Sequence, residues 1–214
     1  EARLTMPPAP GLENLPISTR VRDMGSPLEG YMFDGYLNDD GSVATRNILA
    51  ISTTVQCVAG VVDHAVRRIK SELLPRFPGV DDVVAIEHIY GCGVAIEAPD
   101  APIPIRTLRH IALNPNLSAS TMVVSLGCEK LQPERLFPTG SLPKRASASG
   151  AAREFDLVTL QDASHVGFDA MIRSIMSTAE VHLARLSRRQ RVACPASRLV
   201  VGMQCGGSDA FSGV

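Results

Sequence analysis

The sequence predicts an α/β fold: a mostly parallel sheet of about five strands with helices on both faces, in a Rossmann-like three-layer arrangement. Two observations predict this fold. Short apolar runs rich in β-branched residues alternate with longer segments whose apolar residues recur at helical spacing. Each helical segment is also long enough to be the crossover that parallel strands require.

Five runs are predicted as strands and three segments as helices. The strands are residues 48–53, 82–89, 121–126, 155–160 and 198–203, and the helices are residues 58–74, 103–113 and 166–190. The first helix ends before Pro75 and the second before Asn114-Pro115, because proline cannot continue a helix. The third has basic residues at its carboxyl end, where they complement the helix dipole.

The chain divides into two unequal parts. Residues 1–40 contain prolines at positions 7, 8, 10, 16 and 27 and show no sustained periodicity, so they are predicted as a Pro-rich linker or arm. Residues 41–214 form the α/β domain, of catalytic type. Within it, a short helix is expected to give way to a Pro/Ser-rich loop over residues 133–150.

The composition limits the classes of partner. Lys and Arg number 21 against 22 Asp and Glu, which argues against nucleic acid. No apolar run is long enough to cross a membrane and the first residues do not resemble a signal peptide, so we expect a cytoplasmic chain without membrane contacts. The expected partner is a small molecule. Five scattered cysteines in a chain of 214 residues indicate reduced thiols rather than a disulfide framework.

Four of the five cysteines follow predicted strands. Cys57, Cys92, Cys128 and Cys205 each lie beside glycine or polar residues, whereas Cys194 lies apart from this set. The carboxyl ends of parallel strands share one edge of a sheet, where ligands bind. A single cysteine in such a place is more often a small buried hydrophobic residue. Four together favour a functional edge.

The residue types at this edge indicate several kinds of chemistry. Thiolates, an imidazole and carboxylates are ligands for iron or zinc, although the absence of close C-x-x-C spacing makes the spacing alone a weak indication of metal. His88 is as consistent with a ligand or acid-base role as with a core histidine. Glu129 and Lys130 are either a general acid/base pair or a solvated helix start. Gly206 and Gly207 expose backbone amides suited to a carboxylate.

Longer motifs carry a family resemblance. The segments GYLNDDGSVATRNILAIST, EHIYGCGVAI, PIRTLRHIALNPN, SLGCEKLQPERL and VVGMQCGGSDAFSG resemble, in order and spacing, the altronate/galactarate dehydratase family of sugar-acid dehydratases. The resemblance runs from about Leu28 to the end. YGCGVAI, GCEKLQPERL and AEVHLARL followed by CPASRLVVG resemble the galactarate branch in particular. Ser118-Ala119 and residues 138–150 depart from the family pattern.

The resemblance implies a hydro-lyase. Such an enzyme uses a divalent metal, usually Fe²⁺, and converts galactarate, a sugar diacid, to 5-dehydro-4-deoxy-D-glucarate and water by metal-assisted abstraction of the α-proton and loss of the β-hydroxyl. It also implies a small β-rich domain before this chain and a C-terminal domain after it. We therefore expect the isolated 214 residues to be inactive, and the full-length enzyme to be a homo-oligomer.

The resemblance also suggests a set of site residues. The expected catalytic residues are His88, Cys92, Cys128, Glu129, Lys130 and Asp209; the expected substrate contacts are Thr45, Arg46, Asn47, Gly206, Gly207 and Ser208; the expected metal ligands are Cys205, His88 and Asp209. Three alternatives remain open: a dehydratase of another, altronate-like sugar acid, a hydro-lyase with an iron-sulfur cluster on three edge cysteines, and a noncatalytic α/β binding module.

Overall fold

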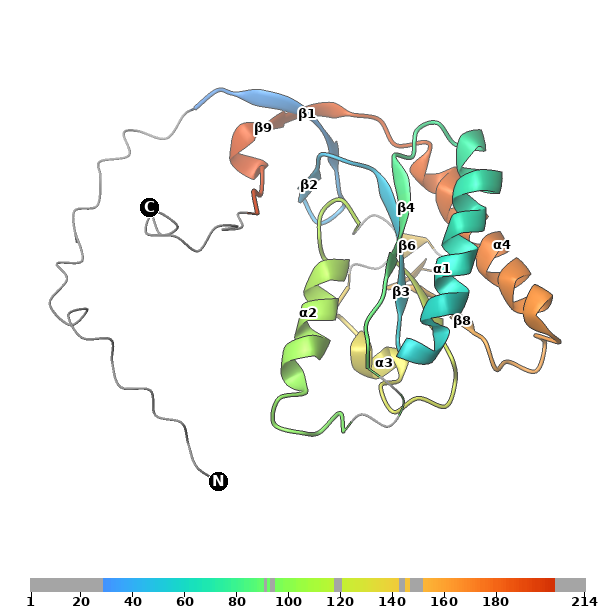
Figure 1. The fold of residues 1–214 in the computed structure, drawn as a ribbon. Helices are drawn as coiled ribbons and strands as arrows, with labels where there is room; N and C mark the ends of the chain where they lie inside the picture. Colours follow the sequence, from blue (N-terminus) through green and yellow to red (C-terminus); the bar gives the residue numbers. More distant parts are fainter. Residues whose placement is uncertain are drawn as a thin grey trace, which may run out of the picture.

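The structure is a computed structural model that describes residues 29–90, 92, 95–117, 121–142, 145–146 and 152–202. A parallel sheet lies at the centre, with helices on both faces and a small antiparallel sheet at one end (Figure 1). The α/β class predicted from the sequence is confirmed.

In the described part of the chain, the central sheet has four strands. They are β3 (Ile48–Thr53), β4 (Asp82–Ile86), β5 (Thr121–Ser125) and β8 (Asp156–Thr159), all parallel, in the order β4-β3-β5-β8. These correspond to four of the five predicted strands. Every residue of β3 and of β5 is buried, as expected for central strands covered on both faces.

Helices cover both faces of this sheet. They are α1 (Ala59–Arg68), extended by a π-helical turn η2 (Ile69–Leu73) and a 3₁₀ turn η3 (Leu74–Arg76), then α2 (Pro102–Ala112), α3 (Pro133–Leu136) and α4 (Phe168–Leu186). The three predicted long helices are confirmed, with boundaries shifted by a few residues. No helix in the described ranges is both long and apolar enough to cross a membrane.

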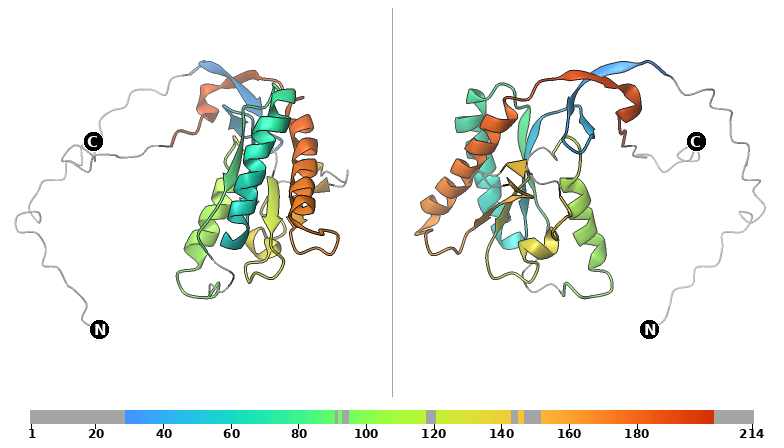
Figure 2. Two further views of the ribbon diagram at one scale, coloured as in Figure 1. Left: turned by 45° about the vertical axis from the view of Figure 1, so that its right-hand side comes forward. Right: turned by 180° about the vertical axis from the view of Figure 1, so that it is seen from behind.

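The sheet separates two hydrophobic clusters. On β3, Leu49 and Ile51 pack against α1 and α4, whereas Ala50 between them packs on the side of α2 and α3. This alternation follows from the two-residue period of a strand. Figure 2 shows α1 and α4 side by side, with α2 apart from them. The molecule thus has three layers.

A second sheet was not predicted. It contains β1 (Met32–Leu37), β2 (Val43–Ala44) and β9 (Val192–Pro195), in the order β2-β1-β9, with antiparallel pairing. β1 lies within the segment predicted as a Pro-rich arm, and it pairs with a strand about 160 residues later in the chain. Two further two-residue strands, β6 (Arg145–Ala146) and β7 (Ala152–Arg153), pair with each other.

The predicted fifth parallel strand is wrong as far as the structure describes it. After β9 the chain forms a 3₁₀ turn η4 (Ala196–Arg198), and residues 199–202 have no regular structure. Val200 and Val201 are 79% and 70% exposed. The apolar run lacks a strand partner because pairing of β9 with β1 directs the chain to the amino-terminal end of the central sheet (Figure 1). The strand order β4-β3-β5-β8 corresponds to 2-1-3-4, which is the order of flavodoxin-like sheets rather than of Rossmann sheets.

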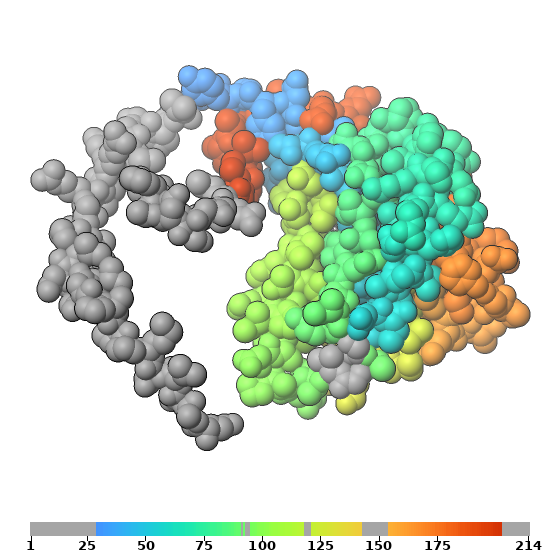
Figure 3. Space-filling model, viewed as in Figure 1, coloured from blue at the N-terminus to red at the C-terminus, as the bar shows by residue number. Residues whose placement is uncertain are grey.

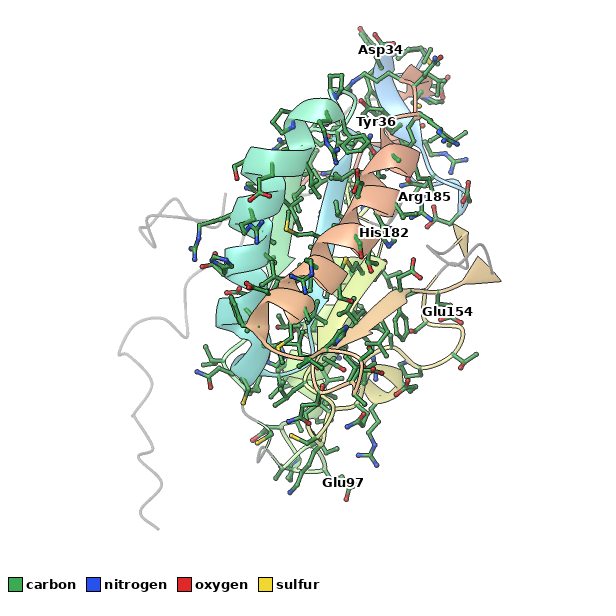
Figure 4. All side chains as sticks on the ribbon, turned by 90° about the vertical axis from the view of Figure 1, so that its right-hand side faces the viewer. Asp34, Tyr36, Glu97, Glu154, His182 and Arg185 are labelled. Carbon is green, nitrogen blue, oxygen red and sulfur yellow. The ribbon has the colours of Figure 1, made fainter. Side chains whose placement is uncertain are left out.

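A buried polar contact links α4 to the sheet. His182 on α4 is 3% exposed, and its Nε2 lies 3.0 Å from Oδ2 of Asp156 at the start of β8. Arg185, one turn further along α4, lies with Nη2 3.1 Å from Nδ1 of the same ring (Figure 4). Because the guanidinium can only donate, Nδ1 is the acceptor and the ring proton is on Nε2, facing the carboxylate.

Asn47 connects the two sheets at the amino end of β3. Its side chain is fully buried and donates to the carbonyl oxygens of Gly79 and Leu186, both at 2.8 Å. It accepts a hydrogen bond from Arg189 Nη1 at 2.9 Å, while Nη2 of Arg189 donates to Asn38 Oδ1 at 2.7 Å. The Arg189 guanidinium also lies over the ring of Tyr36 in β1, 5.1 Å from its centroid.

We expect Asn47→Ala to lower the free energy of unfolding by about 2–4 kcal/mol, because two buried carbonyl groups and one guanidinium N–H lose their partner together. Urea unfolding measures this loss. The adjacent Arg46→Ala, at an exposed position, is the matched control and should change stability by less than about 0.5 kcal/mol. Equal stability of the two variants would contradict a structural role for the Asn47 amide.

Candidate active site at the carboxyl edge of the sheet

The carboxyl ends of β3, β4 and β5 lie together at the lower end of the molecule in Figure 1. From β3 the chain crosses through α1 to β4 on one side, and from β4 it returns through α2 to β5 on the other side. The strand order therefore reverses between β3 and β5. In open α/β sheets, ligands bind beyond the carboxyl ends of the strands at such a switch point.

A buried carboxylate spans this switch point. Glu129, which follows β5, is 2% exposed and accepts a hydrogen bond from the hydroxyl of Thr54, which follows β3. Its Oε1 also accepts the N–H of Leu126 at 3.1 Å, and its Oε2 accepts the N–H of Gly127 at 2.6 Å. These three donors fix the orientation of the carboxylate and compensate for its loss of water.

The turn that carries Glu129 depends on a glycine. Gly127 has φ 118°, a region that side chains disfavour, and a Cβ added there would lie 3.1 Å from Cγ2 of Thr159 on β8. Gly127 therefore permits the tight turn after β5 that brings its own N–H and that of Leu126 onto the carboxylate.

A cavity of about 440 Å³ lies beside Thr54 and Glu129. Its wall is mostly apolar and comes from α2, the segment before it and Leu131; Figure 3 shows α2 and the preceding segment at the lower left of this face. Its lining comprises Thr54, Tyr90, Ala95, Ile96, Ala98, Asp100, Ala101, Ile103, Pro104, Ile105, Leu108, Glu129 and Leu131. The described lining thus includes two carboxylates and no Lys, Arg or His.

His88 lies near this cavity but is not part of its lining. Its Nδ1 accepts the N–H of Tyr90 at 3.2 Å, and its Nε2 is buried with no hydrogen-bond partner among the described residues. Burial lowers the pKa of the ring, partly offset by the carbonyl groups of Thr53 and Thr54. The imidazole is therefore neutral at pH 7, with its proton on Nε2 on the side of these carbonyl groups, although neither lies within hydrogen-bonding geometry.

The predicted convergence of cysteines is confirmed for three of the four. Cys57, Cys92 and Cys128 are exposed in segments that follow β3, β4 and β5, and Cys194 is buried in β9 of the other sheet. Cys205 lies outside the described residues. No three His, Cys, Asp or Glu side chains in the described ranges are placed to hold a metal ion.

The other predicted site residues do not all lie at the carboxyl edge of the sheet. Lys130 is exposed and faces a second hollow, next to the cavity. Thr45, Arg46 and Asn47 precede β3, so they lie at the opposite edge of the sheet; the N–H groups of Thr45 and Arg46 donate to Asn116 Oδ1 at 2.9 and 3.0 Å. Residues 206–209, which include the predicted Gly206, Gly207, Ser208 and Asp209, lie outside the described residues.

Comparison with known proteins places this geometry in a family. Residues 35–187 match the family described as D-galactarate dehydratase/Altronate hydrolase, second domain. The chain belongs to this family. This confirms the resemblance drawn from its motifs, and the matched region includes every described residue of the carboxyl edge discussed above.

Relatives within the family differ in similarity. The chain is 56% identical over its whole length to galactarate dehydratase (L-threo-forming) of Escherichia coli. It is 29% identical over 87% of its length to altronate dehydratase of Bacillus subtilis and 31% identical over 84% to altronate dehydratase of E. coli. The chain spans only 40%, 34% and 33% of the lengths of these three relatives.

The sequence prediction did not single out two residues that the structure brings into the site. Thr54, the partner of Glu129, directly follows a buried strand, and a hydroxyl in that position was the available signal. Arg135 lines the hollow beside Lys130, and it belongs to a quoted family motif. No local pattern distinguishes it from a solvated arginine.

We expect Glu129→Gln to lower the free energy of unfolding by about 1–3 kcal/mol, because the amide NH₂ must face either the N–H of Gly127 or that of Leu126. Chemical denaturation of the variant and of the unchanged chain measures this difference. Glu134→Gln, at an exposed position on α3, is the control and should be nearly neutral. An unchanged stability of the Glu129 variant would show that the three hydrogen bonds do not require a carboxylate.

The lowered pKa of His88 predicts a pH dependence of stability. The unfolded chain protonates this ring near pH 6.5, whereas the folded chain protonates it only at lower pH. Between those two pKa values the unfolded state binds more protons. The contribution of neutral His88 to the free energy of unfolding is therefore fully present above pH 6.5, and it is lost as the pH falls towards the pKa of the folded state. Unfolding free energies measured from pH 7.5 to 5.5 should therefore fall more steeply for the unchanged chain than for His88→Asn. Parallel profiles would refute this assignment.

Proposed function

We propose that this chain is the second domain of a hydro-lyase that removes water from galactarate to give 5-dehydro-4-deoxy-D-glucarate. The observation that carries the proposal is the 56% identity to a galactarate dehydratase over all 214 residues. The buried Thr54–Glu129 pair at the switch point of the sheet supports a ligand site in this domain.

The geometry suggests different roles for Glu129 and His88. Among the described residues, Oε1 of Glu129 accepts two hydrogen bonds and Oε2 accepts one, so Oε2 retains an acceptor position there for a substrate hydroxyl or proton. His88 is neutral and its Nε2 has no partner among the described residues. A neutral imidazole stabilises a developing oxyanion by donating a hydrogen bond rather than by giving up its proton.

These roles match the demands of the reaction. The proton α to a carboxylate is very weakly acidic, so its removal requires stabilisation of the enediolate that forms. The adjacent C–O bond then breaks, and the β-hydroxyl leaves with a proton as water. A base and an oxyanion donor at the same edge would serve the first step.

Fe²⁺ remains part of the proposal, with Cys205, His88 and Asp209 as its candidate ligands; for His88 this role is an alternative to the oxyanion contact, because Nδ1 accepts the N–H of Tyr90 and a nitrogen that binds metal carries no proton. Of these three, only His88 belongs to the described residues, which do not by themselves provide a metal site. The ion would therefore need ligands from outside the described ranges. The same finding gives no support to an iron-sulfur cluster on Cys57, Cys92 and Cys128.

An altronate-like substrate is the second candidate, since altronate dehydratases belong to the same family. Identities of 29% and 31% to these relatives, against 56% to the galactarate enzyme, favour the diacid. A noncatalytic binding module would bind a sugar acid without converting it.

A substrate panel tests the proposal. The full-length protein, assayed with Fe²⁺ for 2-keto acid formation, should convert galactarate with a kcat/KM at least about a hundredfold above that for altronate, because a site built for two carboxylates leaves one subsite unpaired with a monoacid. Residues 1–214 alone should give no product. Preference for altronate would replace the diacid proposal, and binding of galactarate without turnover would favour the noncatalytic module.

A further inference from the structure

A galactarate dianion does not match the charge of the cavity. Asp100 and Glu129 border the cavity, and its described lining contributes no basic side chain. At pH 7 the substrate carries a negative charge at each end, and like charges a few ångströms apart repel each other strongly where water is largely excluded. At least one substrate carboxylate therefore needs a cation outside this lining.

Two cations lie in the neighbouring hollow, which has a volume of about 460 Å³. Lys130 and Arg135 line it, together with Glu97 and apolar atoms of the segment from Ala95 to Ala98. Ala95, Ile96 and Ala98 also line the cavity, so one short segment borders both spaces. Glu129 lines the cavity and Lys130, the next residue in the sequence, lines the hollow, so the two spaces adjoin at these residues.

The backbone of Arg135 is fixed but its side chain is only weakly engaged. Arg109 on α2 donates from Nη2 to the carbonyl oxygen of Arg135 at 2.6 Å and from Nε to that of Leu136. The guanidinium of Arg135 lies 3.6 Å from Oε1 of Glu97, and the two side chains are 55% and 84% exposed. Exposed ion pairs of this kind contribute little, so Arg135 can exchange its partner at low cost.

We propose that Lys130 and Arg135 form a carboxylate subsite that binds one end of the diacid substrate. The inference rests on the proposed function and names the residues that select a diacid. A substrate carboxylate displaces Glu97 from Arg135 and gains the two-pronged hydrogen bonds that a guanidinium offers. The rest of the substrate then reaches towards Oε2 of Glu129. Figure 4 shows Glu97 at the end of the molecule opposite Asp34 and Tyr36, consistent with a position at the carboxyl edge.

Substitutions of opposite sign test the subsite in the full-length protein. Arg135→Ala should raise KM for galactarate about 10- to 100-fold with kcat changed less than about threefold, because a ground-state carboxylate contact is lost. Glu97→Gln should lower KM, because it removes the group that competes for Arg135. Arg106→Ala, which removes an exposed charge on α2 outside both linings, is the control and should leave both constants unchanged.

Adipate provides a second measurement that does not depend on turnover. It is a six-carbon diacid without hydroxyl groups, so it binds carboxylate subsites but cannot be dehydrated. Calorimetry should show weaker adipate binding to Arg135→Ala than to the unchanged protein, and tighter binding to Glu97→Gln. 1,6-Hexanediol, which has the same chain length and no carboxylate, should not distinguish the variants.

The outcomes separate the two proposals. If the unchanged protein does not dehydrate galactarate but adipate binding responds to Arg135 and Glu97 as expected, the dehydratase proposal fails and the subsite stands. If galactarate is dehydrated and Arg135→Ala leaves both KM and adipate affinity unchanged, the subsite is overturned. Equal effects of Arg135→Ala and Arg106→Ala would also overturn it, because they would indicate a general loss of positive charge.

Discussion

The hydrogen bond from the Thr54 hydroxyl to the buried Glu129 carboxylate joins the two strands between which the strand order reverses. Burying a carboxylate is costly unless donors compensate for the lost water, and here the hydroxyl and two backbone amides do so. That requirement explains the positive φ of Gly127, the tight turn after β5 and the position of the cavity beside Thr54. The candidate site is arranged around this one buried carboxylate.

The two ends of the central sheet have different chemistry. At the amino end, Asn47 and Arg189 join the small antiparallel sheet to the core. The amide of Asn47 donates to two backbone carbonyl groups and accepts from Arg189, so its hydrogen bonds are made within the protein. At the carboxyl end, Nε2 of His88 lacks a partner in the described part of the chain, and Glu129 retains an acceptor position. Satisfied groups stabilise a fold, whereas groups with capacity left over are available to a ligand.

Charge is distributed unevenly at the carboxyl edge, with acidic groups at the cavity and basic groups at the adjoining hollow. The cavity carries carboxylates on an apolar wall, and the adjoining hollow carries Lys130 and Arg135. A carboxylate favours the basic side, and a hydroxyl that donates a hydrogen bond favours the acidic side. This arrangement suits a sugar acid that places one carboxylate at the basic hollow and a hydroxyl towards Glu129.

The sequence by itself determined the α/β class, four parallel strands and three long helices, because these depend on local periodicity. It also determined the edge at which Cys57, Cys92 and Cys128 follow their strands, because parallel strands share one direction. It did not predict β1 and β9, because β9 is a strand only through its pairing with β1, about 160 residues earlier in the chain. It assigned a strand to residues 198–203 because an apolar run does not show whether a partner strand is present, and residues 198–202 have none in the described part. Only the tertiary structure showed that Asn47 is buried between carbonyl groups and that Thr54 donates to Glu129, 75 residues later in the sequence. It also showed that Arg135 and Lys130 line the same hollow next to the cavity. Hydrogen bonds and charges of this kind join residues far apart in the sequence, and a local pattern carries no information about which distant group will satisfy them.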